Sequence, residues 1–246
     1  MTSDATLFTN QVVVIVGASN GIGRAAASLI SSRGAKIVIA DMNPEGLAEL
    51  ATELNLPANQ VHVLDVSSQS AVTAFIATII KEHGRIDSLI NSAGIVGQSN
   101  VKIEDLDWSL FEKTIQVNLY GAIWLTQAVI PAMKDKKYGR IVHLASIAGK
   151  EGNPGLSPYN TSKAGMIGFV KGIAKEVAPH GIVINSLAPA VISTPMNSNT
   201  SDETLKYMIS RIPMGRVGQP EEVAEIVAFM ASKACSFTTG FTFDAS

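Results

Sequence analysis

Three residues in the second half of the chain have the types needed to move a proton to or from an alcohol. Tyr159 and Lys163 are four residues apart, so on a helix their side chains project from one face, one turn apart. An ammonium group beside a phenol favours the phenolate and lowers the phenol pKa from its ordinary value of about 10. Ser146, thirteen residues before Tyr159, supplies a hydroxyl that could hold a substrate oxygen. We therefore predict that Tyr159 is a general acid or base assisted by Lys163.

The same spacing also occurs in ordinary amphipathic helices, so the assignment depends on whether the chain binds a redox cofactor. A glycine-rich turn, G-x-x-x-G-x-G, follows the apolar block 12–16 and leads into a helical pattern. Glycines let backbone N–H groups approach a pyrophosphate, and the start of a helix adds a favourable dipole. The alternative is a turn without a ligand. The nucleotide prediction places the turn at Gly17, Ser19, Asn20, Gly21, Ile22 and Gly23.

An acidic residue ends the second apolar block and predicts which nucleotide is preferred. Asp41 lies about twenty residues past the glycines, where a carboxylate accepts hydrogen bonds from the ribose 2′-hydroxyl of NAD and repels the 2′-phosphate of NADP. No arginine or lysine follows in residues 42–44, and Asn20 stands in the turn itself. We therefore expect NAD, with NADP less favoured. The alternative is that Asp41 caps a helix or lies in solvent.

The elements that would position these residues alternate between short β-branched blocks and longer segments of helical periodicity. This alternation predicts an α/β fold, namely a Rossmann-type, doubly wound parallel sheet of about seven strands with helices on both faces. No linker or internal repeat divides the chain, so we expect one domain over residues 1–246. The strand blocks are 12–16, 37–40, 61–64, 88–90, 141–144 and 182–187.

The segment 188–218 is polar, contains several prolines and follows the last strong strand block. Ligands of α/β proteins bind outside the carboxyl ends of the strands, so this segment is a candidate substrate lid. An ordinary surface loop carrying a short helix near 202–210 is an equally supported interpretation.

Composition excludes several other classes of function. The apolar residues amount to 46% of the chain, but their blocks are far shorter than the 20 or so residues of a membrane span. The net charge of −2 argues against nucleic-acid binding, and four widely separated histidines show no metal-ligand spacing. One cysteine and a first segment without a signal-peptide pattern lead us to expect a cytoplasmic protein.

With these motifs in place, the chain resembles the short-chain dehydrogenases/reductases over nearly its full length. The glycine turn, the Asn-Ser-Ala-Gly run at 91–94, and Ser146, Tyr159 and Lys163 occur in the family's order and at fitting spacings. The resemblance implies that Asn118 completes the catalytic set. It also implies cofactor contacts by Tyr159 and Lys163 and by Asp65, Val66, Asn91, Ala93, Gly94, Pro189, Ile192 and Thr194.

The resemblance implies an NAD-dependent oxidoreductase that interconverts a secondary alcohol and a ketone by hydride transfer, and it implies a homotetramer. A 3-oxoacyl-(acyl-carrier-protein) reductase is the alternative within the family, and a non-catalytic NAD-sensing protein is the alternative outside it. A polyol or a sugar-derived hydroxyl is a further candidate substrate. We expect the substrate to contact Ser146 and Tyr159 together with Ala148, Asn153, Val191 and Met196.

Overall fold

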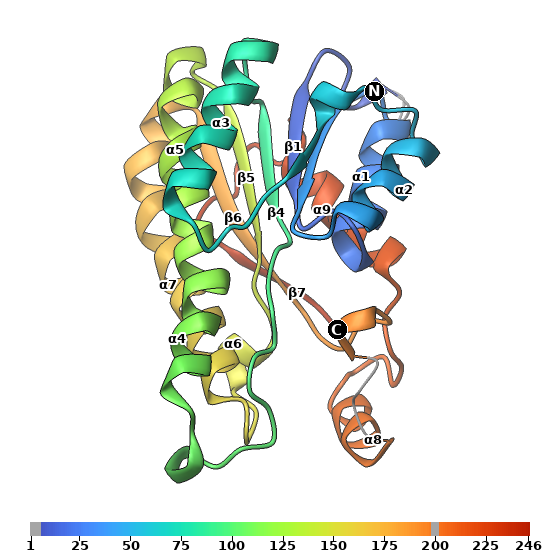
Figure 1. Ribbon diagram of the computed structural model, residues 1–246, viewed down its shortest axis with the longest axis vertical. Helices are drawn as coiled ribbons and strands as arrows, with labels where there is room; N and C mark the ends of the chain where they lie inside the picture. The colour runs from blue at the N-terminus through green and yellow to red at the C-terminus, as the bar shows by residue number, and fades with distance from the viewer. Residues whose placement is uncertain (1–5, 198–201) are drawn as a thin grey trace.

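The apolar blocks of the sequence form one parallel β-sheet at the centre of the molecule (Figure 1). The computed structural model describes residues 6–197 and 202–246. In the described residues the sheet has seven strands in the order β3-β2-β1-β4-β5-β6-β7, and every pairing is parallel. The strands are β1 (Val12–Val16), β2 (Lys36–Asp41), β3 (Val61–Val63), β4 (Ser88–Asn91), β5 (Gly139–Leu144), β6 (Ile182–Pro189) and β7 (Thr242–Ala245).

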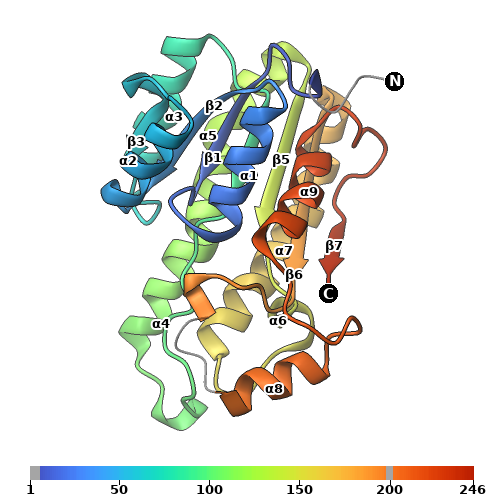
Figure 2. The same ribbon diagram turned by 90° about the vertical axis from the view of Figure 1, so that its right-hand side faces the viewer.

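Helices cover both faces of the sheet, as the strands' continuous burial requires. One face packs against α1 (Gly21–Ser32), α2 (Pro44–Glu53) and α9 (Pro220–Ala231). The other packs against α3 (Gln69–His83), α5 (Gly121–Lys136) and α7 (Ser157–Val177). Figure 2 shows α1 and α9 side by side on the first face. The predicted doubly wound α/β fold is therefore confirmed.

Local sequence signals account for several helix ends. Ser68 caps α3, because its hydroxyl accepts a hydrogen bond from the Ala71 N–H at 3.3 Å. Pro158 lies in the first turn of α7, where its missing N–H costs nothing. The last strand, β7, is absent from the predicted strand blocks, because four residues ending in Asp244-Ala245 carry no clear apolar pattern.

Three shorter helices lie beyond the carboxyl ends of the strands (Figure 1). They are α4 (Trp108–Ile115), α6 (Ala148–Glu151) and α8 (Asp202–Ser210). The short helix expected near 202–210 is thus confirmed as α8, whereas residues 198–201 of the candidate lid lie outside the described residues. Within the described residues, no helix is both long enough and apolar enough to cross a membrane.

The strand order places a crevice where the chain changes direction. From β1 the chain proceeds outward to β2 and β3, and then returns to β4 on the other side of β1. β1 and β4 are neighbours in the sheet, and the loops that follow them lead away from each other. The crevice between two such loops is the usual ligand-binding position in open α/β sheets. Gly17 follows β1, and the Asn-Ser-Ala-Gly run starts with the last residue of β4, so both predicted cofactor motifs lie at this point.

Candidate active site

The glycine turn after β1 has a backbone that only glycine adopts readily. Gly17 has φ of +80° and Gly21 has φ of +53°, in the left-handed region. The Gly17 N–H donates to the Ala40 carbonyl at 2.8 Å, which holds the turn against β2. A Cβ on Gly23 would collide with the Gly17 carbonyl, so α1 begins directly against the turn. Ser19 is buried and Asn20 is exposed within the same loop.

The loop after β4 closes the other side of the crevice. The Ser92 N–H donates to the Val16 carbonyl at 2.8 Å, and a Cβ on Gly17 would collide with the Ala93 backbone N. A Cβ on Gly94 would lie 3.2 Å from Asn118 Oδ1 and 3.4 Å from Lys163 Nζ. Space that side chains would otherwise fill is therefore left beside both groups. This glycine-lined cradle fits a dinucleotide, because the pyrophosphate of the dinucleotide must approach the protein backbone closely.

Asp41 ends β2 next to the glycine turn, with both carboxylate oxygens held by backbone. Its Oδ2 accepts from the Ser19 N–H and its Oδ1 from the Asn43 N–H, both at 3.0 Å. Sequence reasoning did not consider Arg24, whose Nη1 lies 3.5 Å from the Ser19 carbonyl. The Arg24 guanidinium is paired with Glu53 at 2.8 Å, so much of its charge is already balanced.

The remaining predicted cofactor residues lie along the same edge of the sheet. Thr194 faces the turn, because a Cβ on Gly21 would lie 3.1 Å from its methyl carbon. Ile192 is buried and pairs with Gly218, and the Pro189 carbonyl accepts from the Ile147 N–H at 3.1 Å.

Asp65 and Val66 follow β3 and differ in their exposure. Asp65 is exposed, and its Oδ1 accepts from the Ser67 N–H and hydroxyl at 2.9 and 2.7 Å. Val66 is buried against Gly121 of α5. Asp65 therefore shapes its own turn, and Val66 is the one of the two that faces the packed interior.

Asn118 lies in a π-helical turn, Gln116–Tyr120, between α4 and α5. The side chain is fully buried and bonds both backbone groups of Ile95, accepting from its N–H at 2.8 Å and donating to its carbonyl at 2.9 Å. Its amide nitrogen also bonds the Ser162 hydroxyl at 3.0 Å. Single π turns inside helices occur often at functional sites, because they redirect a side chain. Here the turn ties α7 to the loop after β4.

Tyr159 and Lys163 lie one turn apart on α7, with Lys163 Nζ 5.6 Å from the centroid of the Tyr159 ring. Ser146 follows β5, and its hydroxyl accepts from the Ala148 N–H at 3.1 Å. Lys163 is only 4% exposed, and its Nζ donates to the Leu144 carbonyl at 2.6 Å. The structure therefore brings Ser146, Tyr159, Lys163 and Asn118 to one place.

The expected lowering of the Tyr159 pKa is wrong for this structure. Burial raises the Tyr159 pKa above its ordinary value, and a hydrogen bond with Ser146 offsets only part of that rise. The residue as a whole is half-buried, but its hydroxyl is deep enough for desolvation to dominate. Burial also lowers the pKa of Lys163, to about 8. The Lys163 ammonium uses one of its three N–H groups to donate to the Leu144 carbonyl, a partner that the sequence did not predict.

The predicted substrate residues divide between the interior and the rim of the site. Ala148 is buried in α6, and Met196 is 46% exposed in the segment before α8. The Asn160 side-chain amide accepts from the backbone N–H of Asn153 at 3.2 Å and donates to the Asn153 carbonyl at 2.8 Å. These two hydrogen bonds fix the loop between α6 and α7. Val191 lines a cavity of about 240 Å³ together with Ile212 and Met214.

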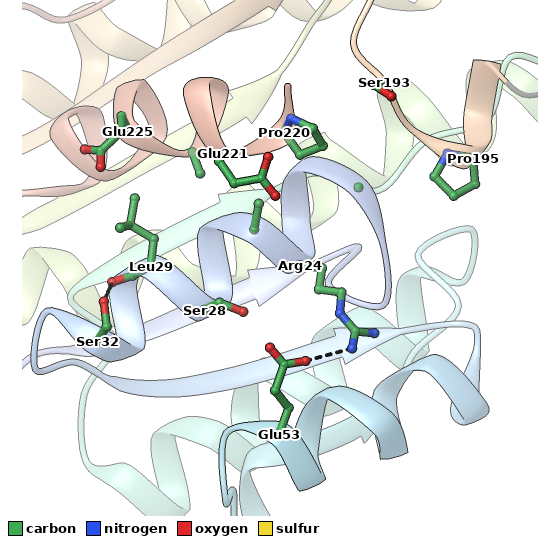
Figure 3. Close-up of a pocket in the computed structure, with 13 residues that line it drawn as sticks. Arg24, Ser28, Leu29, Ser32, Glu53, Ser193, Pro195, Pro220, Glu221 and Glu225 are labelled. Carbon is green, nitrogen blue, oxygen red and sulfur yellow. Dashed lines mark hydrogen bonds and ion pairs between the residues drawn. The ribbon is translucent and has the colours of Figure 1, made fainter. Parts of the chain in front are cut away.

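A larger groove, of about 590 Å³, adjoins the glycine turn at Gly21 (Figure 3). It runs along α1 between Glu53 of α2 and Glu221 and Glu225 of α9, and it reaches Gly21. Ser146, Tyr159 and Lys163 do not line it. The ion pair between Arg24 and Glu53 crosses one side of the groove.

Sequence reasoning missed two parts of the site. The Leu144 carbonyl carries no side-chain signal, since any residue could supply it. The π turn at Gln116–Tyr120 lies within an unbroken helical pattern, so only the extra residue per turn, visible in the backbone, distinguishes it. No group of three or more His, Cys, Asp or Glu side chains in residues 6–197 and 202–246 is arranged to hold a metal ion.

Comparisons with known proteins identify the family. A family model described as enoyl-(acyl carrier protein) reductase matches residues 17–245. The chain is 41% identical to 2-dehydro-3-deoxy-L-rhamnonate dehydrogenase (NAD(+)) of Sphingomonas sp. (strain SKA58), over 97% of this chain and 95% of the relative. It is 39% identical to a 3-oxoacyl-(acyl-carrier-protein) reductase of Thermotoga maritima (strain ATCC 43589 / DSM 3109 / JCM 10099 / NBRC 100826 / MSB8), over 94% of each chain.

A solved structure agrees with the sequence relatives. Levodione reductase superposes with a TM-score of 0.88 at 31% identity, over 97% of each chain. Matches of this extent cover the sheet, the glycine turn and the α7 residues together, and the relatives named above are dehydrogenases or reductases. The chain therefore belongs to the short-chain dehydrogenase/reductase family of oxidoreductases.

Proposed function

We propose that this oxidoreductase uses NAD to interconvert a secondary alcohol and a ketone, with Tyr159 as the proton-transfer residue. The observation that carries the proposal is the meeting of Ser146, Tyr159 and Lys163 beside a glycine cradle at the point where the strand order reverses. When bound, a nicotinamide dinucleotide supplies the hydride acceptor or donor. The protein's part is to orient the substrate and to move one proton.

Each polar side chain has a distinct part in that proton transfer. In reduction, the neutral Tyr159 hydroxyl donates its proton to the oxygen of the carbonyl as that oxygen gains charge. In oxidation, Tyr159 acts as the phenolate and accepts the hydroxyl proton of the alcohol, which returns it to the neutral phenol. The Ser146 hydroxyl holds the same oxygen and stabilises the charge on it. The raised Tyr159 pKa keeps the phenol protonated near neutral pH, which favours the donor state.

Lys163 would control the charge around Tyr159, and Asn118 would hold the backbone beside Lys163. The Lys163 ammonium, with a pKa of about 8, is mostly charged at pH 7 and lies on the same helix face as the phenol. Its charge favours the phenolate as the proton leaves. Asn118 holds the backbone of Ile95, the residue after Gly94. The space beside Gly94, between Asn118 and Lys163, therefore keeps its shape.

Two features of the site and one relative support NAD over NADP. Asp41 is held by two backbone N–H groups in the position of a ribose-binding carboxylate, and the charge of Arg24 is offset by Glu53. The relative at 41% identity is itself named as an NAD(+) enzyme acting on a sugar-derived acid. That name makes hydroxy acids derived from sugars the first substrates to try. The acyl-carrier-protein reductase relative keeps 3-hydroxyacyl thioesters as the second class.

A substrate panel with both cofactors tests the proposal. Polyols, sugar acids, hydroxysteroids and 3-hydroxyacyl thioesters are offered with NAD and with NADP, and the absorbance of the reduced nicotinamide is followed. We expect kcat/KM to be at least about tenfold higher with NAD, because one well-placed hydrogen-bonded group discriminates by that factor or more.

Asp41→Ala should reduce that preference about tenfold or more, since the repulsion of a 2′-phosphate is removed. The exposed α5 carboxylate Asp135, changed to Ala, serves as the control and should leave the ratio unchanged. Equal or better use of NADP by the wild-type enzyme would refute the cofactor assignment. Dinucleotide binding with no turnover of any panel member would instead favour the non-catalytic alternative.

A further inference from the structure

A chain of buried polar groups lies directly beneath the site and includes a histidine that the proposed chemistry does not use. Asn91 at the end of β4 and His143 in β5 are paired in register, so their side chains leave the same face of the sheet. His143 is fully buried. Its Nδ1 is 3.3 Å from the Asn91 amide nitrogen, and its Nε2 is 2.8 Å from the Thr126 hydroxyl of α5.

The backbone at each end of this chain determines the direction of every hydrogen bond. The Ala93 N–H can only donate, so the Asn91 atom 3.2 Å from it must be the acceptor Oδ1. The Asn91 amide nitrogen then faces His143 and donates to it. At the far end, the Ala122 carbonyl can only accept, and it receives the Thr126 hydroxyl proton at 2.8 Å. Thr126 therefore offers its oxygen, not its proton, to His143.

These two ends leave one protonation state for the imidazole. Nδ1 must accept from Asn91, and Nε2 must carry the hydrogen that is donated to Thr126. A second proton on Nδ1 would place a donor against the donor of Asn91. Burial, and secondarily the charge of Lys163, lower the His143 pKa to about 3, which agrees with a ring that stays neutral.

We propose that His143 is a positioning residue for cofactor binding: its Nε2–H tautomer holds the Asn91 amide in the orientation that fixes the Ala93–Gly94 backbone. The inference rests on the proposed function only in that a nicotinamide dinucleotide occupies the cradle. His143 touches neither cofactor nor substrate in this role, and it acts through Asn91.

The consequence for the site follows from what the Ala93–Gly94 backbone contacts. Ala93 lies against Gly17 so closely that a Cβ on that glycine would collide with it. Gly94 lies between Asn118 and Lys163. If the Asn91 amide rotated by half a turn, its nitrogen would face the Ala93 N–H, donor against donor. The Ala93–Gly94 backbone would then lose the hydrogen bond that holds it at this narrow position.

The tautomer is measured directly by NMR of protein with ¹⁵N-labelled histidine. We expect the His143 ring to carry hydrogen on Nε2 alone and to show no titration between pH 6 and pH 9. His62 and His180, which are more exposed, are the internal references in the same spectrum. A ring with hydrogen on Nδ1, or a ring that titrates in this range, would overturn the proposal without any reference to activity.

Binding of NADH, or of NADPH if it is the tighter ligand, tests the consequence in His143 variants. His143→Leu keeps an apolar body but removes both hydrogen bonds, and it should weaken binding about tenfold while changing kcat less. His143→Gln restores an acceptor and a donor on one planar group, so binding should return to within about threefold of wild type. His180→Leu, at an exposed position before β6, is the matched control.

The outcomes separate this inference from the proposed function. If wild-type protein binds neither NADH nor NADPH, the proposed function fails, and the tautomer remains measurable. If His143→Leu binds the dinucleotide as wild type does, the proposed function stands and this inference fails. Should His143→Leu not fold, Thr126→Val decides instead, because it removes only the acceptor of the Nε2–H. We expect it to weaken binding about threefold, and unchanged binding would overturn the proposal.

Discussion

The inner wall and the outer rim of the site are built in different ways. On the inner wall, Asn118 is fully buried, Lys163 is 4% exposed, and both are hydrogen-bonded to backbone carbonyls. On the rim, Met196 and Met214 are 46% and 65% exposed. The difference indicates that the groups proposed for proton transfer are held by buried hydrogen bonds, whereas the side chains proposed to contact the substrate are exposed to solvent.

The hydrogen bonds of the two regions also differ in strength. Arg211 reaches from the end of α8 to Glu151 of α6 at 3.5 Å, with both side chains more than half exposed. An exposed ion pair of that length contributes little to stability. The buried bonds of Asn118, in contrast, cannot be exchanged for water. Substitutions on the wall should therefore alter chemistry and stability, and substitutions on the rim should alter mainly substrate affinity.

The largest expected effect is a loss of turnover on substitution of Tyr159. Tyr159→Phe removes only the hydroxyl, so turnover should fall by about 10²- to 10⁴-fold, the usual contribution of a general acid or base. Binding of NADH should change little, because the ring and the glycine cradle remain. Steady-state kinetics and a fluorescence titration measure the two quantities. Near-normal turnover in this variant would remove Tyr159 from the mechanism.

A second, intermediate effect concerns the stability of the wall as pH changes. Burial lowers the Lys163 pKa from 10.5 to about 8, so the unfolded chain binds more protons than the folded one between these values. The contribution of Lys163 to the free energy of unfolding must therefore rise with pH across this window. Below about pH 8 the full penalty of burying the charge is present, and above about 10.5 it is gone.

Lys163→Met tests this sign, because an apolar chain of similar length carries no buried charge. Relative to wild type, the variant should be most stable near pH 7, and its advantage should shrink as pH rises from 8 towards 10.5. Urea unfolding of both proteins at several pH values measures the difference, and Lys175→Met, on the exposed side of α7, is the control. A constant difference over that range would contradict the assigned shift.

The smallest expected effect lies on the rim. Met214→Ala should change the free energy of unfolding by no more than about 0.5 kcal/mol, because the side chain is mostly exposed. Since Met214 lines the same cavity as Val191, we expect the KM of the best substrate to rise about fivefold, with NADH binding unchanged. A decrease in the free energy of unfolding as large as that of a core substitution would contradict the proposed difference between rim and wall.

Much of the fold follows from local patterns in the chain. The β-branched blocks and the helices between them predict the parallel sheet, because continuous burial and period 3.6 have separate signatures. Strand β7 was not predicted from local patterns, because its position beside β6 depends on pairing between distant residues, such as Ser186 with Thr242. The glycine turn and the α7 pair were recognisable because both rely on near neighbours in sequence.

The tertiary structure alone determined the electrostatics and the supports of the site. The rise in the Tyr159 pKa depends on how deeply its hydroxyl is buried, and the partner of Lys163 is a backbone carbonyl nineteen residues away. The link from Asn91 through His143 to Thr126 joins three separate elements. The sequence by itself determined which chemical groups are present and their order, because residue type and near-neighbour spacing are local. The tertiary structure decided burial and hydrogen-bond direction, because both depend on groups brought together from distant parts of the chain.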